Sequence, residues 1–381
     1  MNVQKICIIG DGLAGLSSAL VLSQENIKID LYIGSNFKKL KNDDRTTAIS
    51  ESSYQFIKQK FNINNFSIFW PNKEIKLFYE DNKIINNFLN FKEKKKNLMY
   101  IFKNKELKQK LNKLIQKKKN IKLIKKNITS VNCVDGNILL KKKKFFYDLI
   151  ILSTGIQSKL YNNISEGRTI EKNYKEIALT ATVTHNTKIN RVSQFFLKEG
   201  PLAILPFNKN TFSVVWSVSN IFFQNKIKFL EKTLREKIKI LPTNLKIKKI
   251  NNIESFPINL NLKTRYYKKN VLILGDGLHA VHPMAGQGFN LVLRDIKKLA
   301  ELMRNILQLG LPLKNSFLLN DFYKARKPEN NIMGLGIDLT NIFFKNHKYF
   351  SPIKRTILNK ISKFTFIKKM SQVISDKGLI T

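Results

Sequence analysis

A glycine-rich turn between an apolar strand and a helix constrains the fold more than any other feature of this sequence. Val3–Ile9 is a continuous apolar run, Gly10–Gly15 reads Gly-Asp-Gly-Leu-Ala-Gly, and a helical stretch extends to about Gln24. The alternating segment Ile27–Ile33 predicts a second strand. Glycines at this spacing allow a tight turn and bring a helix N-terminus up to a phosphate. The pattern therefore predicts a βαβ unit that binds a dinucleotide through Gly10, Gly12, Leu13, Ala14 and Gly15.

A second glycine-rich segment lies near residue 280. The apolar strand Val271–Leu274 runs into Gly275-Asp276, and a loop crosses to Pro283 before a helix predicted over Gly288–Leu307. An aspartate can accept hydrogen bonds from a ribityl chain, and a helix N-terminus can stabilise negative charge on a reduced flavin ring. The alternative is a glycine-rich loop with no ligand.

The remaining pattern predicts an α/β chain of two domains and a tail. Further helices are expected over 47–61, 104–117 and 227–240, and strands over 121–125, 128–134, 145–152 and in a series from 176 to 218. A helical region after Phe317 should break at Pro328 and at Pro352. We expect a Rossmann-like nucleotide-binding domain assembled from separated segments (1–70, 95–165 and 265–305), an inserted, mostly antiparallel β-sheet substrate domain (71–94 and 166–264), and a C-terminal helical tail (306–381).

Charge and cysteine content exclude several classes of protein. The net charge is +41, but the excess is almost all Lys and is spread over every segment, so we expect no nucleic-acid binding. The two cysteines, Cys7 and Cys133, predict neither a disulfide framework nor a metal site, and a reducing, cytoplasmic setting suits them. We expect no signal peptide and no membrane-spanning helix.

Several segments resemble one family of flavoproteins. Gly275–Asp295 resembles the second flavin-binding motif of the para-hydroxybenzoate-hydroxylase-type flavoprotein monooxygenases, and His282–Leu291 resembles the version found in the ubiquinone-biosynthesis hydroxylases. Asp43–Ser50 is similar to the Asp-x-Arg-Thr segment of that branch. Gly200–Pro206 is similar to its middle-domain sheet, and Tyr323–Asn331 to the start of its helical tail. The resemblance covers essentially the whole chain.

The resemblance implies roles for individual residues. The glycines Gly10, Gly12 and Gly15 would face the FAD pyrophosphate, Asp276 would bind the ribityl chain, and Pro283–Asn290 would line the isoalloxazine ring. Arg45 would lie near the cofactor, or else is a solvated loop residue. Lys105 and Gln109 would reach the cofactor, or else form the wet face of their helix. The expected cofactor-binding residues are Gly10, Gly12, Leu13, Ala14, Gly15, Arg45, Lys105, Gln109, Asp276, Pro283, Ala285, Gly286, Gln287, Gly288, Phe289 and Asn290.

Two positions depart from the family pattern. Ile33 stands where an acidic residue usually holds the adenosine ribose, and Thr154 stands where the family has the aspartate of an Asp-Gly pair. These losses affect FAD affinity, use of the nicotinamide donor, or both. We expect Ile33 to lie at an accessible strand end, where Ile33→Glu would restore the missing carboxylate.

The resemblance implies an FAD-dependent aromatic hydroxylase. Such an enzyme uses dioxygen and a flavin hydroperoxide to hydroxylate the ring of a polyprenyl-phenol ubiquinone precursor, with no catalytic side chain and no metal. The electron donor is NAD(P)H or another reductant. The alternative is a non-catalytic relative that binds a prenyl phenol or helps to assemble the ubiquinone-biosynthesis machinery. A flavin-dependent reductase or halogenase shares only the first glycine motif.

A lipid substrate implies contact with a membrane. We expect a cytoplasmic protein bound peripherally to the inner face of a membrane, with other ubiquinone-biosynthesis proteins as further partners. An apolar stripe flanked by lysines could lie on anionic lipid. It comprises Ile353, Ile357, Leu358, Ile361, Phe364 and Phe366. The alternative is a tail helix that packs on the protein's own core.

Overall fold

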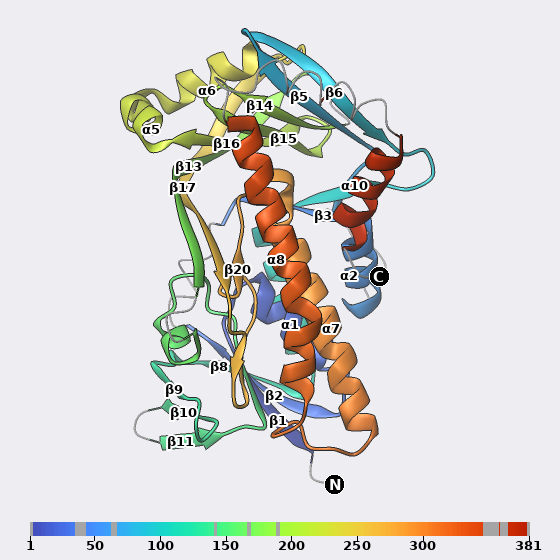
Figure 1. Cartoon of the computed structure of the whole chain (residues 1–381), viewed down its shortest axis with the longest axis vertical. Coiled ribbons are helices and arrows are strands. Elements are labelled where there is room, and N and C mark those ends of the chain that lie inside the picture. The colour runs from blue at the N-terminus through green and yellow to red at the C-terminus, as the bar shows by residue number, and fades with distance from the viewer. Residues whose placement is uncertain are drawn as a thin grey trace.

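The computed structural model describes residues 3–34, 43–61, 67–140, 143–165, 169–187, 191–345, 358 and 365–378. Two sheets lie at opposite ends of an elongated molecule, and long helices run between them (Figure 1). The N-terminus lies at the end of the first sheet, and the C-terminus lies beside the middle of the molecule.

The first sheet carries the N-terminal βαβ unit. Its central pairs β2–β1, β1–β12 and β12–β19 are parallel, and their strands are apolar and buried, as parallel strands covered on both faces must be. Helix α1 (Leu13–Leu22) contacts β1 and β2, and α3 (Asn104–Gln116) and α7 (Gly288–Gln308) contact α1. The strand order is β18 (Tyr267–Lys268), β19 (Val271–Ile273), β12 (Leu149–Leu152), β1 (Gln4–Ile9), β2 (Ile27–Ile33) and β8 (Ile121–Lys125).

The second sheet has eight strands and is mostly antiparallel. Along β15 and β16, Ile204 and Val214 pack with Phe223 of α5 (Asn220–Lys226) and Ile238 of α6 (Leu230–Lys239). The alternate residues face the other way, as the two-residue period of a strand requires. The order is β20 (His279–Ala280), β17 (Ile247–Lys263), β13 (Thr169–His185), β16 (Thr211–Ser219), β15 (Gly200–Asn208), β14 (Val192–Leu197), β5 (Glu74–Asp81) and β6 (Ile84–Lys92).

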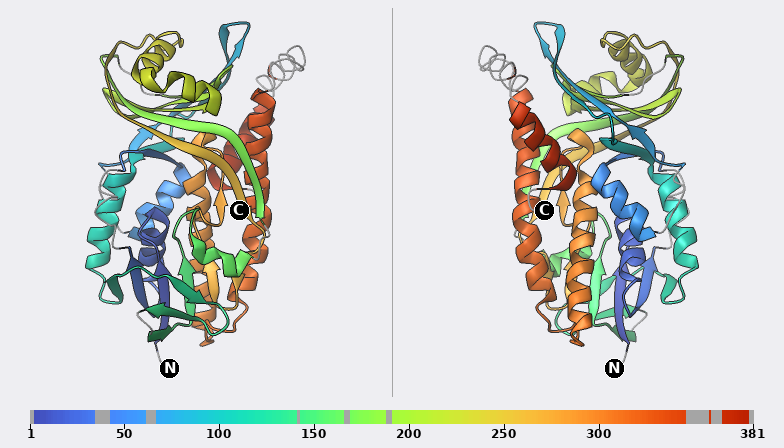
Figure 2. Two further views of the ribbon diagram at one scale, coloured as in Figure 1. Left: turned by 90° about the vertical axis from the view of Figure 1, so that its left-hand side faces the viewer. Right: turned by 90° about the vertical axis from the view of Figure 1, so that its right-hand side faces the viewer.

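Two 17-residue strands join the halves of the molecule. β13 and β17 pair over most of their length and curve from the region of the first sheet into the second (Figure 2). Smaller elements complete the described chain. They are β3 (Thr46–Ser50), α2 (Glu51–Phe61), β4 (Trp70–Asn72), β7 (Met99–Lys103), β9 (Ser130–Asn132), β10 (Asn137–Leu140), β11 (Lys143–Phe146), η2 (Lys159–Tyr161), α4 (Asn162–Ser165), η3 (Ile227–Phe229) and η4 (Met284–Gly286).

The C-terminal region contains α8 (Leu318–Lys345) and α10 (Thr365–Lys377). The predicted break at Pro328 is wrong, because α8 is continuous through this residue. Pro328 lies on the exposed side, and the opposite side of α8 is buried, so tertiary packing offsets the lost backbone hydrogen bond. Of the predicted membrane stripe, the structure describes the burial of Leu358 alone. That residue is buried beside Phe344 of α8.

The α/β architecture expected from the sequence is confirmed, with local corrections. Residues 47–50 form strand β3 rather than the start of a helix, because Thr46–Ser50 pairs with β7. The predicted strand over 145–152 is two strands, β11 and β12, in different sheets. Cys7 and Cys133 are buried free thiols, and burial raises the pKa of both. The domain boundaries expected from the sequence stay a prediction.

Candidate functional site

A cavity of about 1100 Å³ lies between the two sheets. Glycines of the first βαβ unit and the 276–290 loop form its polar part. The second sheet forms an apolar part with side chains that include Leu77, Leu89, Phe91, Val192, Phe196, Leu205 and Val215. A single space therefore joins the dinucleotide motif to an apolar compartment.

Two helix N-termini face this cavity without a capping side chain. Gly12 precedes α1 and has no side chain. Gln287 precedes α7, and its side chain accepts no hydrogen bond from that helix. The first N–H groups of both helices are thus available to a ligand, and each helix dipole favours negative charge there. One cavity with two such termini suits a ligand that carries anionic groups at two places.

The close approach of the turn to β12 depends on glycine at residue 10. Gly10 has a φ of +135°, and a Cβ built on it would lie 2.2 Å from the carbonyl oxygen of Ser153. Gly12 differs, because a Cβ there would have no neighbour within 4 Å and would project into open space. Gly10 therefore shapes the turn, while Gly12 leaves room for a ligand.

Asp276 extends a carboxylate into the cavity. Its side chain is reached by solvent through the cavity, yet protein surrounds it closely, and this burial raises the pKa of the carboxyl group against the opposing effect of His279 and Arg45. A carboxylate in such a place is a strong acceptor for hydroxyl donors of a ligand.

Arg45 is held at the cavity wall by a two-point contact. Its Nε and Nη2 donate to the two carboxylate oxygens of Asp43 at 2.7 and 2.8 Å, and its guanidinium lies over the Phe256 ring. The hydrogen bond that Arg45 donates to the Asp43 carboxylate raises the pKa of Arg45. Asn104 also donates to Asp43, at 3.3 Å, which ties this loop to the start of α3.

Several buried polar atoms along the cavity find no hydrogen-bond partner among the described residues. They are Thr46 Oγ1, Ser153 Oγ, His279 Nδ1 and Gln287 Oε1. Buried polar atoms in proteins are normally paired, and each unpaired one is costly. A polar ligand in the cavity could supply partners for these four atoms.

Most of the residues predicted to bind the cofactor line this cavity. Gly15 is buried behind the turn instead, where its Cβ position lies 2.3 Å from the Gly10 carbonyl oxygen. The structure does not describe the side chain of Ala285. The predicted residues that do line the cavity are Gly10, Gly12, Leu13, Ala14, Arg45, Asp276, Pro283, Gly286, Gln287, Gly288, Phe289 and Asn290.

Lys105 and Gln109 do not line the cavity, whereas Asn104 and Lys108 of the same helix do. Gln109 is exposed. The buried stripe of α3 contains Leu107, Leu111 and Ile115. With 3.6 residues per turn, 104 and 108 flank that stripe, and 109 falls on nearly the opposite side.

Lys108 is a site residue that the sequence reasoning missed. Its Nζ lies 3.2 Å from Asp11 Oδ2 of the glycine turn, and both side chains are largely buried. This ion pair connects α3 to the dinucleotide motif and places a cation beside the N-terminus of α1. The helical spacing of Leu107, Leu111 and Ile115 is the sequence signal that could have placed Lys108 beside the buried side of α3.

The two positions without the family's acidic residues have different environments. Ile33 is 1% exposed and lies in the core rather than at an accessible strand end, so the expectation for this residue is wrong. Gly34, the next residue, lines the cavity. Thr154 also lines the cavity, and its backbone N–H and hydroxyl group both donate to the Tyr161 hydroxyl at 3.0 Å.

This placement changes what a restored carboxylate should do. Ile33→Glu should destabilise the fold by several kcal/mol, because a charge would enter an apolar core without a partner. Gly34→Asp should tighten FAD binding by about tenfold, because the new Cβ meets only the Asn127 side chain and the carboxylate can reach a ribose. Urea denaturation and FAD titration measure the two effects. An Ile33→Glu variant as stable as the wild type would contradict the burial of this strand end.

Each histidine of the 279–282 segment pairs with a carboxylate from another element of the fold. His279 Nε2 lies 2.6 Å from Asp295 Oδ2 of α7. His282 Nδ1 accepts from the Met284 N–H, so its Nε2 carries the proton and donates to Glu176 at 3.0 Å. Glu176 lies 106 positions from His282 and Asp295 lies on the following helix, so local spacing does not reveal either pair. Among the described residues, no three potential ligands gather to hold a metal.

Asp295 is the centre of a buried polar network. Arg326 of α8 donates to its carboxylate at 2.6 Å, and Asn330 donates at 3.1 Å. Burial would raise the pKa of Asp295, but Arg326 and His279 outweigh it and hold the pKa below its usual range. The network fixes the 279–282 segment against α7 and α8.

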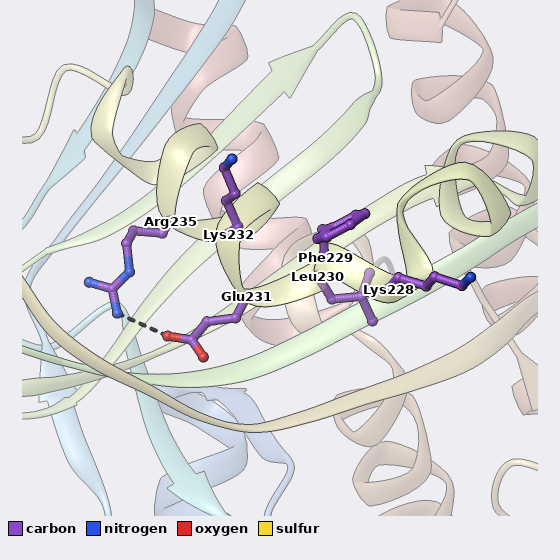
Figure 3. A pocket seen from close by; sticks show the side chains of 6 residues that line it. All are labelled: Lys228, Phe229, Leu230, Glu231, Lys232 and Arg235. Atoms are coloured by element: carbon purple, nitrogen blue, oxygen red, sulfur yellow. Dashed lines mark hydrogen bonds and ion pairs between the residues drawn. The ribbon is translucent and has the colours of Figure 1, made fainter.

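A second hollow lies on the outer surface of η3 and α6. Figure 3 shows the side chains of Lys228, Phe229 and Lys232 on this surface, and Glu231 paired with Arg235 at 3.0 Å. Neither helix N-terminus described above faces it. This hollow is therefore not a candidate active site.

Comparison with known proteins identifies the polar part of the cavity. Residues 153–309 match a model of an FAD binding domain. The chain is 28% identical over 171 residues to the mitochondrial ubiquinone biosynthesis monooxygenase COQ6 of Xenopus tropicalis, and 28% identical over 167 residues to the ubiquinone hydroxylase UbiL of Rhodospirillum rubrum. In sequence the chain is thus similar to the FAD-dependent hydroxylases of ubiquinone biosynthesis. It is also 30% identical over 118 residues to the 3-demethoxyubiquinol 3-hydroxylase of Escherichia coli.

The alignments with these hydroxylases are partial. They cover 35%, 43% and 31% of this chain and 37%, 38% and 30% of the relatives, so the chain spans about a third of the length of the curated relatives it matches.

Solved structures match over much more of the chain. The p-nitrophenol 4-monooxygenase PnpA of Pseudomonas putida has a TM-score of 0.77 at 13% identity and covers 97% of each chain. PqsL, a probable FAD-dependent monooxygenase of Pseudomonas aeruginosa, has a TM-score of 0.74 at 14% identity over 93% of this chain and 100% of PqsL. This likeness shows the shared fold.

FAD suits the residues that line the polar part of the cavity. The open space beside Gly12, the uncapped N-termini of α1 and α7, and the unpaired polar atoms meet the needs of a pyrophosphate and a flavin ring. Within the described chain, no helix is long and apolar enough to cross a membrane.

Proposed function

We propose that this protein is an FAD-dependent monooxygenase that hydroxylates the aromatic ring of a polyprenyl-phenol ubiquinone precursor with dioxygen. The observation that carries the proposal is the continuous cavity, which joins the FAD cradle to an apolar compartment. The names of the sequence relatives support the substrate class, since they are ubiquinone hydroxylases and monooxygenases.

The chain's own residues would bind, orient and shield the reactants. When bound, FAD supplies the activation of dioxygen that no side chain can provide. Gly10, Gly12 and the N-terminus of α1 would hold the pyrophosphate, Asp276 the ribityl chain, and the N-terminus of α7 the ring. The loop from Pro283, which lines the cavity, would help to keep water from the ring.

The apolar compartment would receive the phenol and the first part of its prenyl chain. Its walls come from β5, β6, β14, β15 and β16, whose cavity-facing residues are mostly hydrocarbon. A few polar groups, such as Gln194 and Ser213, line the same walls and could orient a phenol hydroxyl group. A largely apolar pocket with few polar groups selects a ring that carries a lipid tail.

The His282–Glu176 pair would position the loop over the flavin ring. Glu176 accepts from His282 at 3.0 Å and from Lys345 of α8 at 2.6 Å. Burial would raise the pKa of Glu176, but His282 and Lys345 outweigh it and lower the pKa. A carboxylate that stays ionised keeps His282 in one tautomer, and this holds Pro283 and Met284 in place.

Reconstitution with FAD tests the proposed reaction. The purified protein should bind FAD and, once the flavin is reduced chemically under anaerobic conditions and then exposed to air, add one oxygen atom to a short-chain prenyl phenol. Mass spectrometry of the product measures the outcome. Reduced free FAD without protein is the control. Flavin reoxidation with no oxygenated product from any prenyl phenol would contradict the proposal. Comparison of NADH and NADPH as reductants identifies the donor.

A non-catalytic relative is the second candidate, and the buried Ile33 and the neutral Thr154 favour it. Such a protein would bind the prenyl phenol or assist other ubiquinone-biosynthesis proteins without turnover. It would take up the prenyl phenol in a binding assay but leave the reduced flavin uncoupled or unbound.

The proposed roles of the site residues, the domain boundaries and a peripheral attachment to the inner face of a membrane all form part of the first proposal.

Removal of the Asp276 carboxylate should weaken FAD binding. Asp276→Ala loses a charge-assisted acceptor worth about 1.5–3 kcal/mol, so the dissociation constant for FAD should rise by roughly ten- to a hundredfold. Quenching of flavin fluorescence on titration measures the constant. Asp135→Ala removes an exposed carboxylate elsewhere and serves as the control. Equal flavin content in both variants would refute the ribityl role of Asp276.

A further inference from the structure

The cavity opens to solvent between α8 and α10. Thr340 of α8 and Ser375 of α10 are exposed and line it, as does Lys96 of the loop after β6. Gln372 of α10 donates to Glu93 at 2.9 Å, so α10 lies beside this loop. Figure 2 shows α8 and α10 on the same side of the molecule, and Figure 1 shows α10 to the right of α8, close to α2 and β3.

Both helices that reach this opening also carry exposed apolar side chains. On α8, residues 332, 335, 339 and 342 recur every three or four positions, so they form one stripe along the outer side of the helix. Leu339 is 64% exposed and directly precedes Thr340 at the opening. On α10, Met370 and Val373 are about half exposed. The stripe lacks a charged residue between 332 and 342 apart from the buried Asp338.

Exposed lysines flank the same opening. The loop after β6 carries Lys94, Lys95 and Lys96, and α10 carries Lys369. We use the name mouth rim for these apolar and basic residues together. They are Ile332, Leu335, Leu339, Ile342, Met370, Val373, Lys94, Lys95, Lys96 and Lys369. The mouth rim is therefore apolar at its centre and basic at its edge.

We propose that the mouth rim docks on an anionic lipid bilayer, so that the cavity opens directly into the membrane surface. Apolar side chains would enter the interface while the surrounding lysines meet the lipid headgroups. This proposal rests on the proposed function, because a prenyl phenol dissolved in the bilayer could then pass between α8 and α10 without crossing water.

Charge favours a lipid surface over a second copy of the chain. A two-fold dimer through the mouth rim would place the same lysines of both copies opposite one another, and the whole chain carries a net charge of +41. An anionic leaflet removes this repulsion and turns each lysine into a favourable contact.

The outer surface of η3 and α6 provides a matched control. It also combines exposed apolar residues with lysines, among them Phe229 and Lys228 (Figure 3). However, α5 and α6 cover the side of the second sheet that faces away from the cavity. A membrane bound there would leave the cavity opening in water.

Vesicle flotation of the full-length protein tests the proposal. Wild-type protein should float with phosphatidylcholine vesicles that contain phosphatidylglycerol, and much less with phosphatidylcholine alone or in high salt. Leu335→Glu/Leu339→Glu and Lys94→Glu/Lys95→Glu should each lower the bound fraction by at least about tenfold. The controls Ile221→Glu/Phe229→Glu and Lys226→Glu/Lys228→Glu should bind as wild type does.

The outcomes separate docking from catalysis and from self-association. Unchanged flotation of both rim variants, or its loss in the control pairs, overturns the proposal. A rim variant that converts a dimer to a monomer in light scattering, with vesicle binding retained, also overturns it. FAD content and the melting temperature verify that each variant is folded. Turnover of a short-chain, water-soluble prenyl phenol reports the proposed function independently, since that substrate needs no membrane.

Discussion

Gly12→Val should abolish FAD binding while leaving the fold intact. A Cβ at Gly12 has no protein neighbour within 4 Å, so the valine side chain enters the cavity rather than the core. It occupies the space that the pyrophosphate needs at the N-terminus of α1. We expect an affinity loss on the order of a hundredfold or more, equivalent to about 2.7 kcal/mol. Flavin retained through purification and isothermal titration of the apoprotein measure the loss.

Two other glycines make this result interpretable. Gly15→Val should unfold the protein, because its Cβ position lies 2.3 Å from the Gly10 carbonyl oxygen and the side chain cannot move away. Gly336→Ala, in an exposed and uncrowded part of α8, should bind FAD normally. A Gly12→Val protein that kept its full complement of flavin would refute the assignment of this turn to the pyrophosphate.

Removal of Asp295 should destabilise the fold more than any other single carboxylate change at the site. Asp295→Ala leaves the buried Arg326 guanidinium without its carboxylate partner and removes the acceptor of His279. Loss of one member of a buried ion pair typically costs about 3–5 kcal/mol. Urea denaturation at neutral pH measures the effect. Lys298→Ala breaks an exposed pair on the same helix and should cost less than about 1 kcal/mol.

The same residue predicts a pH dependence. The pKa of Asp295 is lower in the folded protein than in the unfolded chain, so the unfolded state takes up a proton first. The stabilisation is therefore complete above the unfolded pKa of about 4 and is lost as the pH falls below it. Asp295→Asn should show a shallower acid-induced loss of stability than the wild type. Parallel acid profiles for both proteins would show that Asp295 does not carry this dependence.

Local sequence patterns predicted the parts of the site that lie within one segment. The turn from Gly10 to Gly15 and the segment from Gly275 to Asn290 each carry their own signal, since glycine spacing, a preceding strand and a following helix are contiguous. The strands β1 and β19 were equally clear, because parallel strands are buried on both faces and read as apolar runs, and β2 was predicted from its alternating residues.

Contacts between distant segments were not predictable in the same way. His282 finds Glu176 across 106 positions, and Asp295 finds Arg326 only because α7 and α8 pack together. The side of α3 was assigned wrongly because Lys105 and Gln109 were chosen by family analogy rather than by the position of Leu107 and Leu111. Ile33 was misjudged because the sequence does not reveal that this strand end pairs with β8 and lies in the core.

The division of the FAD cradle between the two ends of the chain has a consequence for biosynthesis. Gly12 leaves the ribosome early, but its partner segment around Asp276 follows only after both long strands and every strand of the second sheet except β20 have been made. The N-terminal unit therefore cannot complete its sheet at first, because β1 lacks its neighbour β12 on one side until that later strand has been synthesised. Cofactor capture is thus a late event, and free FAD can act as a ligand that selects completed chains from unfinished ones.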